Sequence, residues 1–319
     1  MELKVPGDKS ISQRGLIFAA LARGKSRVRG ILCSGDPSST AGALRRLGVA
    51  IPDLGPDISI EGLGLRGLQA PCGLLDLGNS GTGARLLLGV LAGQPFEAVL
   101  TGDESLRSRP MARVMDPLTA MGGSYSALEQ PGRLPIRVTG GALKPLSYDM
   151  PVASAQLKSS LLLAGLVGGV DVRLVEPGRS RDHTERVLGG MGVPVVSGPK
   201  DGGWGVDLIS PPADLPALDL HVPGDFSSAA FLILFGLLQE SPEPLILKDI
   251  GLNRTRTGML PVLERMGGRF TIHESPGPEG GEAWGDIVVE PSQLSGCEIG
   301  GSEIPALIDE VPILAIGAA

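Results

Sequence analysis

The strongest chemical signal in the chain is a lysine and an arginine near the start of a predicted helix. Ser10 and Arg14 belong to a helix that we expect over 10–23, with Lys9 directly before it and Gly24 at its end. Cations in a first helical turn oppose the helix dipole, at a cost of up to about 1 kcal/mol each. Free N–H groups at a helix N-terminus bind phosphate and carboxylate. The segment therefore predicts an anion site, with a solvated surface turn as the alternative.

A glycine-rich turn provides a second candidate anion site. Residues 77–85 follow a predicted strand and open an apolar helix over 86–91. Glycine lets backbone N–H groups approach a ligand closely. The turn lacks the spacing of a Walker A loop or a dinucleotide fingerprint, so by itself it indicates only a polar strand-to-helix turn. Its candidate ligand-binding residues are Asn79, Ser80, Gly81 and Thr82.

Polar groups also mark four further predicted helix starts. Pro110 suits a first helical position, which places Arg109 at a helix start. The other three are the segment 154–156 (Ser154, Ala155, Gln156), Arg181, and the pair Asp309 and Glu310. Arginine can bind a phosphate or carboxylate in a fork, and a carboxylate can accept a hydrogen bond from a substrate hydroxyl. Solvation of the arginine, ordinary N-capping and a dipole effect are the alternatives.

Composition excludes several classes of protein. The 319 residues carry a net charge of −7 and only 3% aromatic residues, which argues against nucleic-acid binding but permits a local basic pocket. Three scattered cysteines and three distant histidines give no metal-ligand spacing, so we expect no metal and a reducing cytoplasm. The apolar runs are too short to span a bilayer, and we expect no signal peptide.

The chain contains an internal repeat. Four glycines that follow helix-like stretches recur about every 73 residues, at Gly48, Gly122, Gly192 and Gly267. Each should end a helix and turn the chain into a short strand. The expected strands are 50–51, 124–126, 194–196 and 269–271. This pattern predicts stacked α/β units.

A second repeated sequence predicts how the units are divided between domains. Val-Pro-Gly-Asp occurs at 5–8 and again at 222–225, each time before an apolar helix. We therefore expect a three-unit domain over 9–221 and a second, partial domain of 1–8 plus 222–319. The run 308–319 is apolar and uncapped, so we expect roughly 120 further residues after it.

Taken together, the segments resemble the enolpyruvyl transferases, and specifically the 5-enolpyruvylshikimate-3-phosphate synthase family. The resemblance covers the whole chain and rests on motifs in the family's order. They are 6–12, 78–82, Arg109-Pro110, 154–158, 181–185 and Asp309-Glu310. It implies an α/β (α+β) fold of two domains built from βαβαββ units, the second incomplete here. It also implies transfer of the enolpyruvyl group of phosphoenolpyruvate to shikimate 3-phosphate with release of phosphate, in chorismate and aromatic amino acid biosynthesis.

The resemblance also implies a role for each site residue. Lys9 would contact phosphoenolpyruvate and share in proton transfer, and Asp309 would orient the attacking 5-hydroxyl. The remaining expected phosphoenolpyruvate ligands are Asn79, Ser80, Gly81, Thr82 and Arg109, and those for shikimate 3-phosphate are Ser10, Arg14, Ser154, Gln156 and Arg181. Ala155 replaces a serine of many members, which Arg181 would offset. The family uses no cofactor or metal, acts as a cytoplasmic monomer when complete, and is the target of glyphosate.

Two other functions stay open. UDP-N-acetylglucosamine enolpyruvyl transferases are similar but usually carry a reactive cysteine before their Arg-Pro, and 102–108 contains none. The other possibility is a phosphosugar-binding fragment, or half of a split enzyme. Several of the family's active-site segments would lie beyond 319, so we expect little turnover from this polypeptide alone.

Overall fold

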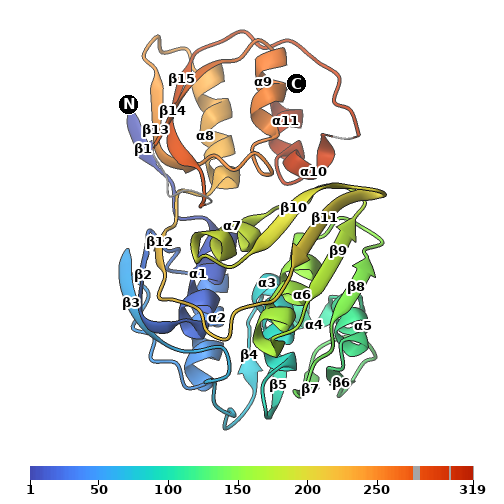
Figure 1. Ribbon diagram of the computed structural model, residues 1–319. Helices are drawn as coiled ribbons and strands as arrows, with labels where there is room; N and C mark the ends of the chain where they lie inside the picture. The colour runs from blue at the N-terminus through green and yellow to red at the C-terminus, as the bar shows by residue number, and fades with distance from the viewer. Residues whose placement is uncertain (276–280, 302, 319) are drawn as a thin grey trace. The chain divides into compact units, whose positions relative to one another are not determined.

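The computed structural model describes residues 1–275, 281–301 and 303–318 (Figure 1). The chain forms two compact units. Unit 1 contains Met1–Asp8, Arg179–Asp182 and Val222–Ala319, and unit 2 contains Lys9–Gly178 and His183–His221.

The strands of unit 2 form three sheets in its described residues. The first has the order β12-β2-β3, from β12 (Asp219–His221), β2 (Arg23–Arg29) and β3 (Asp57–Leu63). The second has the order β4-β5-β7-β6, from β4 (Leu75–Asp76), β5 (Glu97–Thr101), β7 (Ile136–Thr139) and β6 (Ser124–Ala127). The third has the order β10-β11-β9-β8, from β10 (Val195–Lys200), β11 (Gly203–Leu208), β9 (Val172–Glu176) and β8 (Leu146–Asp149). Each sheet contains a parallel pair, β12/β2, β4/β5 or β8/β9, extended by antiparallel pairing.

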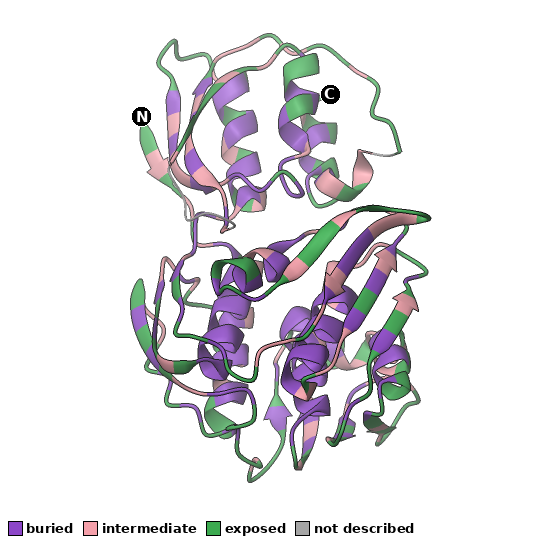
Figure 2. Cartoon of the chain, in the orientation of Figure 1, coloured by how far each residue is buried: buried purple, intermediate pink, exposed green. Residues whose placement is uncertain are grey.

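Three buried helices form the centre of unit 2. They are α1 (Lys9–Leu21), α3 (Gly81–Ala92) and α6 (Ala155–Gly168). Apart from their first residues and Arg85, their side chains are buried (Figure 2). Close packing of α3 on α6 needs a glycine, because a Cβ on Gly89 would lie 2.1 Å from the carbonyl oxygen of Ser160. The remaining helices are α2 (Asp36–Arg46), α4 (Glu104–Ser108), α5 (Ala112–Ala120) and α7 (His183–Gly190).

Unit 1 has a sheet of order β1-β13-β15-β14 in its described residues. Its strands are β1 (Glu2–Lys4), β13 (Leu245–Gly251), β14 (Arg269–Glu274) and β15 (Trp284–Glu290), and its helices are α8 (Phe226–Leu238), α9 (Met259–Arg265), α10 (Ile304–Leu307) and α11 (Val311–Gly317). Unlike α1, α3 and α6, helix α8 exposes an apolar face. The side chains of Phe231, Phe235 and Leu238 are 60%, 53% and 50% exposed.

The two Val-Pro-Gly-Asp segments exchange first strands between the repeats. Strand β1 precedes α1 in the chain but pairs with β13 of unit 1, whereas β12 precedes α8 but pairs with β2 of unit 2. The segments also pair with each other. The backbone N–H of Asp8 donates to Pro223 O at 2.8 Å, and that of Asp225 donates to Pro6 O at 2.9 Å. The exchange gives α1 and α8 the strand–helix–strand setting that β4-α3-β5 and β8-α6-β9 have without exchange.

The repeat pattern predicted from the glycines agrees with the structure at most positions. All four glycines have positive φ, from 74° at Gly192 to 103° at Gly122, as a helix-ending glycine requires. The predicted strands at 124–126, 194–196 and 269–271 coincide with β6, β10 and β14 to within a few residues. The strand predicted at 50–51 is wrong, since β3 begins only at Asp57. Prolines at 52 and 56 explain the delay, because proline cannot donate to a strand ladder.

Candidate active site

Hydrogen bonds between side chains tie the N-terminal ends of α1, α3 and α6 together in unit 2. Ser80 Oγ, at the N-cap of α3, donates to Gln13 Oε1 of α1 at 3.1 Å. Gln156 Nε2, in the first turn of α6, donates to Thr82 Oγ1 of α3 at 2.8 Å. Arg85 Nη1 donates to Gln156 Oε1 at 2.9 Å. Three helix N-termini therefore meet, and each brings the positive end of its helix dipole.

The turn before α3 has the backbone geometry that its glycines suggest. Gly78 has φ of +53°, and its N–H donates to Asp76 Oδ1 at 2.9 Å. A Cβ at this position would also lie 2.7 Å from Ser39 Oγ, so both the backbone conformation and the lack of space require glycine. Ser80 Oγ accepts the N–H of Gly83 at 3.1 Å and caps the helix.

Arg109 reaches this turn from a different local structure than predicted. Helix α4 ends at Ser108, Arg109 is its C-cap with an extended backbone, and Pro110 lies between α4 and α5. The prediction that Pro110 begins a helix, with Arg109 at its start, is therefore wrong. Arg109 Nη2 nevertheless donates to Asn79 Oδ1 at 2.5 Å, and Asn79 Nδ2 donates to Asp103 Oδ2 at 2.7 Å.

Two guanidinium groups converge on Gly81 at the start of α3. A Cβ on Gly81 would lie 2.9 Å from Nη1 of Arg109 and 2.9 Å from Nη1 of Arg85. Burial lowers the pKa of Arg85, and the positive charges of Arg109 and Arg113 lower it further. Beyond the effect of burial, the neighbouring arginines repel the charge of Arg85, and an anion at this helix end would relieve that repulsion.

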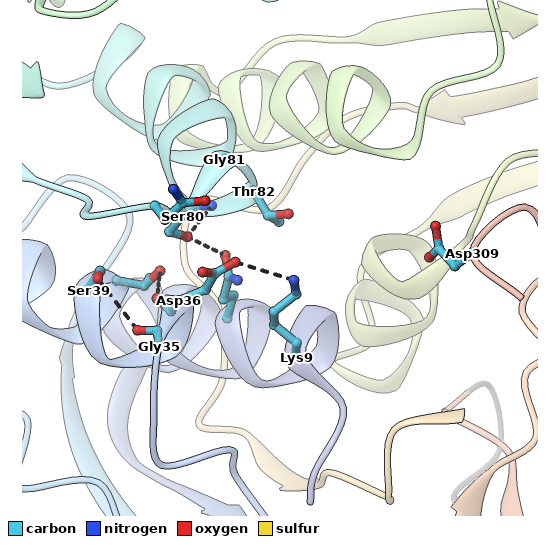
Figure 3. Close-up of polar contacts among 12 residues, drawn as sticks. Lys9, Gly35, Asp36, Ser39, Ser80, Gly81, Thr82 and Asp309 are labelled. Carbon is cyan, nitrogen blue, oxygen red and sulfur yellow. Dashed lines mark hydrogen bonds and ion pairs between the residues drawn. The ribbon is translucent and has the colours of Figure 1, made fainter. Parts of the chain in front are cut away.

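Lys9 lies at the first position of α1, which spans Lys9–Leu21 rather than 10–23. Gly24 has a positive φ but lies within β2, so it does not end the helix. The ammonium group of Lys9 is turned toward Asp36, with Nζ 3.5 Å from its Oδ2 (Figure 3). The Lys9 side chain is 53% exposed, so this ion pair is weak and can be exchanged for a ligand.

Arg14 is almost completely buried and bound to protein oxygens. Its Nε donates to Thr184 Oγ1 at 2.8 Å, and its Nη2 donates to Ser159 Oγ at 2.8 Å. Its Nη1 donates to the carbonyl oxygen of Ser10 at 3.0 Å. These contacts add the start of α7 to the three joined helix ends. They also fix the guanidinium group, so a ligand would meet Arg14 in a preset orientation.

The start of α6 shows an N-cap and a buried ion cluster. Ser154 Oγ accepts the N–H of Leu157 at 3.4 Å, which is the capping role that the sequence left open. One turn further on, Lys158 is completely buried, with Nζ 2.8 Å from Glu176 Oε1 and 2.8 Å from Glu185 Oε1. This cluster anchors α6 to β9 and α7.

Asp309 belongs to unit 1, where it lies between α10 and α11. The predicted helix start at Asp309 and Glu310 is confirmed, since Glu310 is the N-cap of α11, and residue 319 lies outside the described residues. Asp309 Oδ2 accepts from Nη2 of Arg181 and, at 2.9 Å, from Nη1 of Arg256. Burial raises the pKa of Asp309, but the two arginines outweigh it and hold that pKa below its usual value. Glu310 makes no side-chain cap at α11 and instead accepts from Ser227 Oγ, so the capping alternative is wrong for this residue.

Three residues without a predicted role connect the candidate residues, namely Gln13, Arg85 and Arg256. Gln13 lies one helical turn after Lys9, and that spacing is the only signal that could have found it. Arg256 lies in a polar Thr-Arg-Thr stretch before α9.

The described residues show neither a metal-binding cluster nor a membrane-spanning helix. Among residues 1–275, 281–301 and 303–318, no cluster of acidic, histidine or cysteine side chains is arranged to hold a metal. Within those same ranges, no helix has the length and apolar character needed to cross a membrane.

Repeated units of alternating strands and helices with polar and cationic helix ends define an α/β protein of the enolpyruvyl transferase class. The family model for EPSP synthase (3-phosphoshikimate 1-carboxyvinyltransferase) matches residues 1–319. The chain is 47% identical over 312 residues to a 3-phosphoshikimate 1-carboxyvinyltransferase of Shouchella clausii, and 48% identical over 318 residues to that of Geobacillus thermodenitrificans. Each match covers 98% of this chain and 71% of the relative. A solved EPSP synthase of Acinetobacter baumannii aligns with a TM-score of 0.90 at 39% identity, over 100% of this chain and 71% of that one. The chain belongs to the EPSP synthase family.

Proposed function

We propose that the chain carries out the reaction of this family. The enolpyruvyl group of phosphoenolpyruvate is transferred to the 5-hydroxyl of shikimate 3-phosphate, and inorganic phosphate is released. The observation that carries the proposal is the family match over all 319 residues, together with identities of 44–48% to curated members. The activity belongs to chorismate and aromatic amino acid biosynthesis, in the cytoplasm, with a monomer as the complete enzyme.

The proposal assigns phosphoenolpyruvate to the start of α3. Asn79, Ser80, Gly81, Thr82 and Arg109 bind its phosphate and carboxylate, and Lys9 shares in proton transfer. The two guanidinium groups beside Gly81 and the lowered pKa of Arg85 support this assignment, since they favour an anion at that helix end.

Shikimate 3-phosphate is assigned to the starts of α1 and α6 and to Arg181. Ser10 and Arg14 hold its carboxylate and a hydroxyl, Ser154 and Arg181 hold its phosphate, and Gln156 packs on its ring. Asp309 orients the 5-hydroxyl for attack. The depressed pKa of Asp309 supports a hydrogen-bond acceptor that stays ionised at neutral pH.

The chemistry explains why so many cations are needed. Both substrates are phosphorylated and carboxylated, so they repel each other in water. Arginine and lysine side chains fixed by protein contacts can hold them in near-attack geometry without reorganising during the reaction. The Arg14 contacts to Ser159 and Thr184 supply this kind of fixation.

Two assays on the 319-residue chain test the proposal. Calorimetry should detect binding of shikimate 3-phosphate, and Arg14→Gln should weaken it whereas Arg137→Gln should not. Arg137 is a matched control because it is half-exposed and paired with Glu97 of β5, and it is not among the proposed ligand-binding residues. Phosphate release is then measured with both substrates, alone and after adding a polypeptide that corresponds to the unmatched part of a relative. Absence of both binding and turnover in every mixture contradicts the proposed function.

The apolar face of α8 favours a second candidate, namely one part of a two-chain enzyme. Phe231, Phe235 and Leu238 lie along one side of this helix and are at least half exposed, whereas the corresponding helices of unit 2 are buried all round. Turnover that requires the added polypeptide would support this candidate. Binding without turnover in any mixture would favour a non-catalytic phosphosugar-binding protein.

A further inference from the structure

Asp309 shares a single carboxylate oxygen between two arginines whose surroundings differ. Arg256 is 5% exposed and donates Nη1 to Asp309 Oδ2 at 2.9 Å. Arg181 donates Nη2 to the same oxygen from the short segment Arg179–Asp182, and its side chain is 24% exposed. All of these residues belong to unit 1.

Arg256 is held on several sides. Its Nη2 donates to Ser227 Oγ at 2.9 Å and lies 3.6 Å from Asp225 and 3.8 Å from Asp8. Ser227 in turn donates to Glu310. Asp8 and Asp225 are the last residues of the two paired Val-Pro-Gly-Asp segments. Arg256 is therefore built into the first turn of α8 and the strand exchange, and leaving Asp309 would also take a countercharge away from the largely buried carboxylates of Asp8 and Asp225.

Arg181 has no comparable enclosure. It is partly exposed, it belongs to a segment of four residues, and the proposed function assigns it to the substrate phosphate. A guanidinium group binds a phosphate best through two parallel N–H groups, so a bidentate contact that uses Nη2 of Arg181 competes with its hydrogen bond to Asp309. The two roles therefore favour an exchange of partner.

We propose that Arg256 is a positioning residue for Asp309: it keeps the carboxylate fixed and ionised, so that Arg181 can exchange Asp309 for the substrate phosphate. The proposal rests on the proposed function for the identity of that phosphate. Without Arg256, departure of Arg181 would leave Asp309 without either of its arginine partners and next to the carboxylate of Glu310, and its ionised form would be disfavoured.

The charged groups around the ion pair of Arg256 and Asp309 come from several elements. Arg181 lies before α7, Arg256 before α9, Asp8 before α1 and Asp225 at the N-cap of α8, and Glu310 follows Asp309 directly. Removing Arg256 therefore changes the local balance from two cations to one against the same acids. The expected consequence is an upward shift in the pKa of Asp309.

A titration without substrate tests the positioning role. The carboxyl carbon of Asp309 is followed by ¹³C NMR, assigned with Asp309→Asn, in the wild type and in Arg256→Gln, Arg256→Lys and Arg265→Gln. We expect a higher Asp309 pKa in Arg256→Gln and a partial return in Arg256→Lys, which keeps the charge but loses the fork. Arg265→Gln is the matched control, because Arg265 lies in the same unit and pairs with Glu303. An unchanged Asp309 pKa in a folded Arg256→Gln protein overturns the proposal. If Arg256→Gln does not fold, the proposal is overturned when the Asp309 pKa in Arg256→Lys equals the wild-type value.

Binding of shikimate 3-phosphate tests the exchange. We expect Arg256→Gln to weaken binding at least about tenfold at neutral pH and to move the acid limb of the binding profile to higher pH. Addition of the ligand should shift the side-chain ¹⁵N resonance of Arg181 much more than that of Arg256. Equal shifts, or a variant that loses thermal stability while its binding profile stays wild-type, would overturn the exchange. If the chain binds no shikimate 3-phosphate, the proposed function is contradicted. The substrate-free titration of the Asp309 carboxyl group still tests the positioning role of Arg256.

Discussion

Replacing Lys158 by methionine should destabilise unit 2 far more than a surface lysine replacement does. Lys158 and Glu176 are 0% exposed, the Glu185 side chain is 7% exposed, and the ammonium nitrogen lies 2.8 Å from an oxygen of each glutamate. Methionine fills the space of the lysine stem, so the loss of packing is small and the loss of charge dominates. The variant removes the cation that two buried carboxylates share.

The magnitude follows from the burial of this cluster. Removing one partner of a buried ion pair costs about 3–5 kcal/mol, because a carboxylate that stays out of water loses its compensation. A typical domain has a total stability of about 5–15 kcal/mol, so the loss is a large fraction of it. Lys200 is the matched control, since its side chain is 45% exposed and its Nζ lies 3.7 Å from Asp207. Lys200→Met should cost less than about 1 kcal/mol.

The two tryptophans allow each unit to be followed separately. Trp204 lies in β11 of unit 2 and Trp284 in β15 of unit 1. Urea unfolding followed by fluorescence in a Trp284→Phe background therefore reports unit 2 alone. The variant that combines Lys158→Met with glutamine at both glutamates should recover part of the loss. A Lys158→Met protein no less stable than Lys200→Met would refute the reasoning.

Three further outcomes are expected. Gly89→Ala should lower the free energy of unfolding by about 1–3 kcal/mol, because the new Cβ would lie 2.1 Å from Ser160 O, and unchanged urea curves would contradict this. In the chain mixed with the added polypeptide, Gly81→Ala should weaken inhibition by glyphosate, because the new methyl group would lie 2.9 Å from Arg109 Nη1. Equal inhibition constants for the two proteins would be evidence against this expectation. The folded-state pKa of Asp309 is depressed, so its ion pairs stabilise the protein above the unfolded pKa of about 3.9 and are lost as pH falls through the folded value. In a plot of melting temperature against pH, Asp309→Asn should therefore show a flatter acid limb than the wild type. The difference should be small, because the Asp309 side chain is nearly half exposed. Parallel acid limbs for the two proteins would contradict this expectation.

Local sequence patterns predicted the helix ends but not what each end contacts. Ser80 and Ser154 are N-caps because short polar side chains can accept the third N–H of a helix, and this is a local property. The contacts of Arg14 with Ser159 and Thr184 join residues 145 and 170 positions apart. No pattern within one helix could indicate them, since they depend on how α1, α6 and α7 pack.

The wrong predictions arose where two local signals competed. Pro110 suits a first helical position, but Asp103 accepts the N–H of Leu106 and begins α4 earlier. The proline then separates two helices instead of beginning one. The four glycines, in contrast, predicted the repeats well, because a positive φ after a helix is a strong and purely local requirement.

The cations that the proposed function gives to the substrates differ in how easily a ligand can engage them. Lys9 and Arg181 have partly exposed carboxylate partners, and Arg109 has an exposed amide partner, so an incoming anion replaces contacts of low net worth. Arg14 has buried partners on two other helices, α6 and α7, and leaving them would cost hydrogen bonds at a buried position. We therefore expect Arg14 to hold its place when ligand binds, while the other three exchange partners. Neutralising Arg14 should then reduce affinity at every salt concentration, whereas neutralising Lys9 should matter less as salt screens its exposed charge.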